Sequence, residues 1–153
     1  MTKIVVETFI CAPIEIVFDA ARDVEIHTQT TKHTREKIVA GRRTGLFELG
    51  DEVTFEATHF WVRQQLGARI VKMNAPHNFT DEMLRGAFKS LRHEHRFQSV
   101  ENSTRMTDIL TWTAPLGVLG KVADALFLRR YMTRFLRRRN QELKHLVEAR
   151  NTL

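Results

Sequence analysis

The sequence has few of the residues that mark specialised classes of protein. It contains one cysteine, Cys11, so an intramolecular disulfide is excluded and a reducing, cytoplasmic setting is expected. No apolar run approaches the roughly 20 residues that span a bilayer. Glu7, Glu15 and Asp19 interrupt the N-terminal segment, so it does not resemble an export signal.

Motifs for catalysis and cofactors are also missing. The sequence has no P-loop, no dinucleotide fingerprint, no Ser-His-Asp arrangement, no cysteine pair and no His-Glu-x-x-His. We therefore expect no cofactor and no metal, although histidines on neighbouring strands could supply three ligands.

The composition fits an ordinary globular protein with one charged segment. With 153 residues, 42% hydrophobic and 27% charged, we expect a single domain over residues 1–153 with a proper core. The net charge is +6, and much of the excess lies in one segment with Arg129, Arg130, Arg134, Arg137, Arg138 and Arg139. This segment is either a solvated helix face with local salt bridges or a surface for an anionic partner.

The order of patterns predicts an α+β fold. Residues 3–10 are rich in β-formers, Ala12-Pro13 opens a short helix, and Asp23 can cap a second one. About six strands joined by short turns follow, which favours an antiparallel meander. After Pro115, a long amphipathic helix is expected from about Lys121 to Arg150, and the concave sheet face is the available partner for its apolar side.

Two strands alternate clearly. Over residues 51–61, one face carries Val53, Phe55, Ala57, His59 and Trp61. Over residues 91–97, Leu91, His93, His95 and Phe97 share a face opposite Arg92, Glu94 and Arg96. The histidines therefore point inward with apolar residues. An apolar interior that also holds hydrogen-bonding groups is typical of a small-molecule cavity.

These residues resemble the START-like superfamily, also called SRPBCC, with its helix-grip fold. The resemblance covers nearly the whole chain and rests on four segments, which are 12–19, 50–55, 79–97 and 108–120, together with Arg139-Asn140. It implies a curved antiparallel sheet wrapped around the C-terminal helix, two short helices after the first strand, and a cavity between sheet and helix. It is closest to the small single-domain bacterial members. The superfamily includes lipid carriers and polyketide cyclases, so it implies a pocket rather than a reaction.

The expected ligand is a small, mostly apolar molecule such as a lipid, isoprenoid, polyketide or aromatic. Three histidines, His59, His93 and His95, would orient it. The predicted apolar wall consists of Phe55, Phe79, Met83, Phe88, Phe97, Trp112, Leu119, Ala123, Leu126 and Phe127. The long helix and the glycine-rich region 41–50 are candidate gates.

Three functions stay open at this level. The first is a carrier or sensor for the apolar ligand. The second is a cyclase or dehydratase in which His93 or His95, oriented by Asp108, moves a proton; the alternative for these residues is a structural hydrogen bond. The third is an interaction module that docks its arginine-rich helix on anionic membrane or RNA.

Asp81 could line the pocket mouth or pair with Lys89 across the bend at Gly86.

Overall fold

The computed structural model describes residues 1–152 and confirms the helix-grip architecture. Seven strands form one antiparallel sheet in the order β1-β7-β6-β5-β4-β3-β2. Their bounds are β1 Thr2–Ile10, β2 Lys37–Gly41, β3 Glu52–His59, β4 Val62–Asn74, β5 Asn78–Arg85, β6 Ser90–Val100 and β7 Ser103–Thr113. The first strand, β1, pairs with the last strand, β7, so β1 and β2 form the two edges of the sheet.

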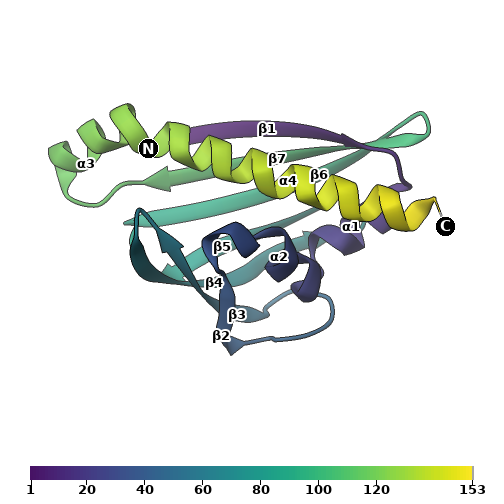
Figure 1. The fold of residues 1–153 in the computed structure, drawn as a ribbon, viewed down its shortest axis with the longest axis horizontal. Helices are drawn as coiled ribbons and strands as arrows, with labels where there is room; N and C mark the ends of the chain where they lie inside the picture. Colours follow the sequence, from purple (N-terminus) through teal and green to yellow (C-terminus); the bar gives the residue numbers. More distant parts are fainter. Residues whose placement is uncertain (153) are drawn as a thin grey trace.

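The helices fall in two groups. After β1 come α1 (Ile14–Ala21), α2 (Val24–Thr30) and the short turn η1 (Lys32–Thr34). The C-terminal helix runs as α3 (Gly117–Ala123), the π-helical segment η2 (Asp124–Leu128) and α4 (Arg129–Asn151). Figure 1 shows α4 lying along the sheet, with α3 at one end of the molecule and α1 near the other.

The helix boundaries have simple local causes. Asp23 accepts hydrogen bonds from the backbone N–H groups of Glu25 and Ile26, as expected of an N-cap. Pro13 precedes the first helical residue of α1. The C-terminal helix begins at Gly117, a turn earlier than the expected Lys121, because Leu116 in a left-handed conformation reverses the chain directly after β7.

Two apolar clusters fill the space between the layers. The larger one joins α1 and α2 to the sheet and to Leu143 and Val147 of α4. The smaller one, around Trp112 and Leu136, lies under the first turns of α4. Trp112 also anchors the helix, since its Nε1 donates to Asp124 Oδ1 at 2.8 Å within η2. The sheet and helix are therefore tied together at both ends, with the middle left for cavities.

The predicted orientation of one side chain, Trp61, is wrong. In β3, Val53, Phe55, Ala57 and His59 share the inner face as expected. Trp61 does not follow them and is 97% exposed. The strand ends at His59, and Trp61 lies in the tight turn to β4, where alternation no longer holds.

Candidate functional site

Two adjoining cavities lie between the sheet and α4. The first has a volume of about 130 Å³ and is lined by Ala21, His27, Glu36, Phe47, Val53, Phe55, Leu66, Ala68, Ile70, Phe79, Asp81, Leu91, His93, His95, Leu110, Met132, Phe135, Leu136 and Arg139. The second, of about 140 Å³, is lined by Glu36, Phe55, Ala57, His59, Phe60, Gln64, Gln65, Leu66, Ala87, Phe88, Leu91, Leu128, Tyr131, Met132 and Phe135.

Side chains shared by the two cavities form the partition between them. Those shared are Glu36, Phe55, Leu66, Leu91, Met132 and Phe135. Two of them are held by His27, because Glu36 accepts its hydrogen bond and Phe55 stacks on its ring. The two cavities therefore share one wall made of side chains.

A buried carboxylate organises the polar wall of the first cavity. Asp108 is fully buried on β7 and lies opposite His95 in the β6–β7 register. Its Oδ1 lies 2.8 Å from His93 Nε2, and because a carboxylate only accepts, the imidazole donates. Its Oδ2 accepts from Asn140 Nδ2 of α4 at 2.7 Å. The network thus links sheet to helix.

The second histidine is held on several sides. His95 Nε2 donates to Asp81 Oδ2 at 3.1 Å. Its Nδ1 lies 2.9 Å from Asp108 Oδ1, but the alignment leaves that nitrogen without a hydrogen bond. The ring stacks on Phe79 with 4.1 Å between centroids and lies 3.8 Å from the ring of His93. His95 is therefore fixed in orientation.

Burial and neighbours separate the protonation behaviour of these groups. Burial alone would raise the pKa of Asp108, but the hydrogen bond from His93 and the neighbouring imidazole of His95 outweigh it and hold the pKa well below the usual value. Burial would lower the pKa of His95, yet Asp108 and Asp81 together raise it. Burial and the charge of His95 lower the pKa of His93 despite Asp108. The pKa values of the two histidines are thus moved in opposite directions, so that His95 takes up a proton more readily than His93.

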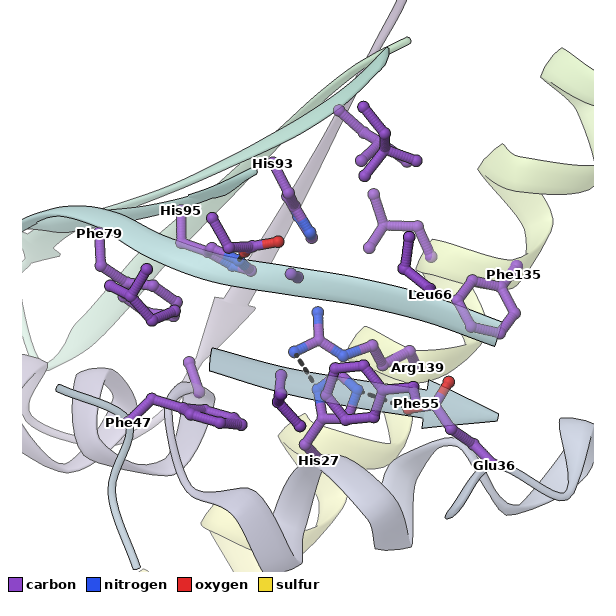
Figure 2. Close-up of a pocket in the computed structure, with 18 of the residues that line it drawn as sticks. His27, Glu36, Phe47, Phe55, Leu66, Phe79, His93, His95, Phe135 and Arg139 are labelled. Atoms are coloured by element: carbon purple, nitrogen blue, oxygen red, sulfur yellow. Dashed lines mark hydrogen bonds and ion pairs between the residues drawn. The ribbon is translucent and has the colours of Figure 1, made fainter. Parts of the chain in front are cut away.

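A second polar chain crosses the same cavity. His27 Nε2 donates to Glu36 Oε1 at 2.6 Å, and Arg139 Nη2 lies 3.5 Å from His27 Nδ1. Burial would raise the pKa of Glu36, but the charge and hydrogen bond of His27 lower it. Figure 2 shows the Arg139 guanidinium inside the pocket, between His27 and the two β6 histidines.

Arg139 is an unusual group in this wall. It is 6% exposed, and its Nε has no hydrogen-bond partner within residues 1–152. A buried cation with a free donor is costly unless something accepts from it. Arg139 thus brings a buried guanidinium to the lining of the first cavity, with its Nε–H left unpaired beside it.

The second cavity has a simpler polar element. His59 Nδ1 lies 2.6 Å from the Tyr131 hydroxyl, and the Tyr131 ring packs on Phe60 at the tip of the β3–β4 turn. Burial lowers the pKa of His59 and raises that of Tyr131. Both groups are thus neutral near pH 7 and suited to hydrogen bonding.

Asp81, His93 and His95 also have the donor types of a metal site. One ligand atom from each lies within 4.8 Å of the others. However, each ring already has a carboxylate partner. A dication would have to displace these hydrogen bonds. The absence of a metal stays a prediction.

The predicted site residues fall in three places. The first cavity includes Phe55, Phe79, His93 and His95, and the second includes Phe55, His59 and Phe88. Asp108 stands behind the histidines rather than in the lining. The predicted wall residues Met83, Phe97 and Trp112 line neither cavity and pack in the apolar clusters.

The predicted positions in the first part of the C-terminal helix need correction. Leu119, Ala123, Leu126 and Phe127 are exposed and line neither of these cavities. Their segment extends past the end of the sheet, so no strand faces them (Figure 1). Residues of α4, namely Met132, Phe135 and Leu136, occupy the role predicted for them.

Sequence reasoning missed His27, Glu36, Arg139 and Asn140 as site residues. It left Asp81 undecided between the pocket mouth and a pair with Lys89, and the structure places Asp81 in the lining of the first cavity, bonded to His95. A signal existed for two of the missed residues. Arg139 and Asn140 follow Leu136 by three and four residues and precede Leu143, so they share its buried helix face. His27 and Glu36 come from α2 and the segment before β2, where no periodicity marks a face.

The fold is found in many solved structures. TTHA0849 from Thermus thermophilus is 18% identical with a TM-score of 0.80, covering 97% of this chain and 98% of that one. A START superfamily protein from Mycobacterium smegmatis is 13% identical, with a TM-score of 0.74 and coverages of 96% and 97%. Major latex-like protein 151 from Panax ginseng is 13% identical, with a TM-score of 0.67 and coverages of 94% and 95%.

The likeness to these structures, one of which is a START superfamily protein, shows the helix-grip fold that the resemblance implied. No protein-family model and no curated protein matches the sequence. None of the helices within residues 1–152 is long and apolar enough to cross a membrane.

Proposed function

We propose that the protein binds a small, mostly apolar molecule between the sheet and α4, as a carrier or sensor. The observation that carries this proposal is the apolar cavity with the unpartnered Arg139 Nε in its wall. A cavity that served only as imperfect packing would not hold a buried guanidinium with a free donor.

The ligand's shape and polarity follow from the lining. Phe55, Leu66 and Phe135 border both cavities, so they would contact the apolar body of a lipid, isoprenoid, polyketide or aromatic molecule. Arg139, His93 and His95 line the first cavity only and supply polar groups there. An oxygen acceptor at one end of the ligand would receive a hydrogen bond from Arg139.

Native mass spectrometry of freshly purified protein, followed by solvent extraction, tests this proposal. The variant Ala68→Leu fills the first cavity and Ala57→Leu fills the second, since both alanines are buried in the lining. Val71→Leu on the exposed side of β4 is the matched control. We expect a co-purifying compound that the control keeps and the filled variants lose.

If the purified protein is empty, the fluorescent probe 1-anilinonaphthalene-8-sulfonate replaces the natural ligand. The probe should bind the wild type and the control, and bind Ala68→Leu at least roughly tenfold more weakly. Equal occupancy or equal probe affinity in all the variants would show that the cavity is not the binding site.

A second candidate is a polyketide cyclase- or dehydratase-like enzyme, and the His93–Asp108 pair favours it. His93 donates through Nε2 to Asp108, and its pKa is lowered chiefly by burial, so it is a neutral base beside the cavity. His95 would act by position and charge. If turnover is found, His93→Gln and His95→Gln should abolish it while probe binding survives; a loss of both in parallel would mean that the histidines serve only binding or folding.

An anionic surface is the proposed second partner. Arg129, Arg130, Arg134, Arg137 and Arg138 are exposed, whereas Arg139 turns inward to the cavity. Across residues 1–152 none of these five exposed arginines forms an ion pair with a carboxylate, so the expected local salt bridges do not account for them. Binding that weakens steeply with salt would support this partner.

A further inference from the structure

The first part of the C-terminal helix carries an exposed apolar surface. We call it the end patch, and it consists of Leu116, Val118, Leu119, Val122, Leu126 and Phe127, which are 79%, 76%, 74%, 51%, 61% and 64% exposed. Scattered apolar residues on a surface need no explanation, but six large ones within twelve positions of one helical segment do.

The end patch is exposed because its segment has little to pack against. The main packing of α3 is with the helical turn η2 that follows it, and Figure 1 shows α3 at one end of the molecule beside the end of β7. The segment is nevertheless held in place. Asp124 of η2 is buried and accepts from Trp112, so the apolar side chains are presented on an anchored helix rather than a loose tail.

A second apolar element lies at the same end. The turn between β3 and β4 exposes Phe60, Trp61 and Val62, which are 49%, 97% and 57% exposed. Phe60 and Trp61 both have left-handed backbone angles, with φ of 51° and 60°. Hairpin turns of this kind favour asparagine and glycine, so two bulky aromatics there are strained in a way that folding does not require.

The hairpin tip and the helix meet at the second cavity. The Phe60 ring packs on Tyr131 of α4 with 4.4 Å between centroids. Phe60 and exposed Ala87 line the second cavity together with Leu128, directly after the end patch. The cavity therefore reaches the surface between the two exposed apolar elements.

Positive charge borders the end patch on its C-terminal side. Leu126 lines one shallow hollow with Arg129, Arg130, Arg134 and Arg137, so apolar and cationic side chains share a helix face. Lys121 is exposed within the patch itself. This combination of an apolar surface with adjoining basic residues is the pattern of proteins that lie on anionic lipid.

The charges also decide between possible occupants. A second copy of this chain on the same patch would bring two sets of uncompensated arginines together, which costs energy. Single-stranded RNA is bound by aromatic platforms, but the end patch is mainly aliphatic. A bilayer with anionic headgroups accepts both the aliphatic side chains and the arginines.

We propose that the end of the molecule formed by α3, η2 and the β3–β4 turn docks on anionic lipid bilayers, with the mouth of the second cavity toward the lipid. Docking does not require a ligand in either cavity. Exchange of an apolar ligand with the bilayer through this mouth rests on the proposed binding function.

Co-sedimentation with vesicles tests docking in the absence of ligand. We compare vesicles of phosphatidylcholine alone with vesicles that also contain phosphatidylserine. Wild type should bind the anionic vesicles, and Leu119→Ser/Leu126→Ser should bind them roughly tenfold more weakly. Arg130→Gln/Arg134→Gln should lose the preference for phosphatidylserine. The control Leu49→Ser changes a leucine that is 62% exposed, close to the 61% of Leu126, and that lies before the start of β3, at the opposite end of that strand from the β3–β4 turn; it should bind as wild type does.

Tryptophan fluorescence gives an independent readout. The chain has two tryptophans, of which Trp112 is fully buried and Trp61 is almost fully exposed. Vesicle binding should shift the emission to shorter wavelength and make it sensitive to brominated lipid, and Trp61→Phe should remove this response. A response that persists in Trp61→Phe would place the contact elsewhere and overturn the proposed orientation.

Three other results would overturn docking. The first is that the protein binds neither kind of vesicle. The second is that Leu119→Ser/Leu126→Ser binds vesicles as tightly as wild type. The third is that the wild type does not bind vesicles but forms a dimer in sedimentation analysis, and that the leucine variant dissociates this dimer. Tight binding of single-stranded RNA that depends on the arginines alone would assign the surface to RNA. Failure of the cavity proposal is separate, because the filled variants Ala68→Leu and Ala57→Leu keep the end patch intact.

Discussion

Replacement of Asp108 by asparagine tests how the buried network holds the sheet to α4. The carboxylate is fully buried and joins His93, His95 and Asn140. Asparagine keeps the shape and one acceptor but removes the negative charge and places an amide N–H₂ beside a histidine donor. Loss of one partner of a buried charged network costs about 3 kcal/mol, and for a chain of this size that corresponds to a fall in Tm of roughly 6–12 °C.

The pH dependence of this loss distinguishes the network from simple packing. The folded-state pKa of Asp108 lies below its ordinary value of 3.8, so its stabilisation is complete above that pH and is lost as pH falls through the folded-state value. The folded-state pKa of His95 lies above 6.5, so its stabilisation is complete below pH 6.5 and is lost as pH rises through the folded-state value. The stability gap between wild type and Asp108→Asn should therefore be largest between these two limits.

Urea unfolding at a series of pH values from about 4 to 9 measures the difference in free energy of unfolding between the two proteins. At each pH, both proteins are unfolded in the same buffer. Glu52→Gln is the control, because Glu52 is half exposed in a surface pair with Arg69 and should change stability little. Equal stability of Asp108→Asn and wild type at about pH 6, or a gap that does not vary with pH, would refute the charged network.

Three further substitutions have defined outcomes. Tyr131→Phe removes the hydroxyl partner of His59 and should cost about 1 kcal/mol in thermal unfolding; an unchanged Tm would mean that the pair contributes nothing. Asp124→Leu leaves a buried indole N–H without its acceptor and should cost about 2 kcal/mol, with a changed near-UV circular dichroism signal; an unchanged signal would show that the anchor is dispensable. Gly120→Ala would place a Cβ 1.8 Å from the carbonyl oxygen of Pro115, so α3 must shift at a cost of about 2 kcal/mol; a variant that unfolds like wild type would contradict the close approach.

The architecture could be predicted from the sequence because local patterns are sufficient for it. Alternation over residues 91–97 gave the inward face of β6, and the turn between β6 and β7 set the register that pairs His95 with Asp108. Pro13 and Asp23 marked the two short helices. Each of these signals acts over a few residues, so no knowledge of distant contacts was needed.

The candidate site could be predicted only in part. His93 and His95 were found because strand periodicity shows which way a side chain points, whereas Phe79 was found because it lies in a segment that carries the family resemblance. His27 and Glu36 were missed because they reach the cavity only through the way α2 and the start of β2 pack on the sheet. Periodicity gives a face, but it does not say which elements meet across a cavity.

The C-terminal helix shows the same division most clearly. The sequence by itself determined that the segment is helical, amphipathic and rich in arginine. Only the tertiary structure decided that Arg139 is buried in a cavity wall while Arg137 and Arg138 face solvent, and that Leu119 and Leu126 have no strand beneath them. The physical reason is that helix periodicity fixes relative positions around an axis, whereas burial depends on where the sheet ends and where the helix lies on it.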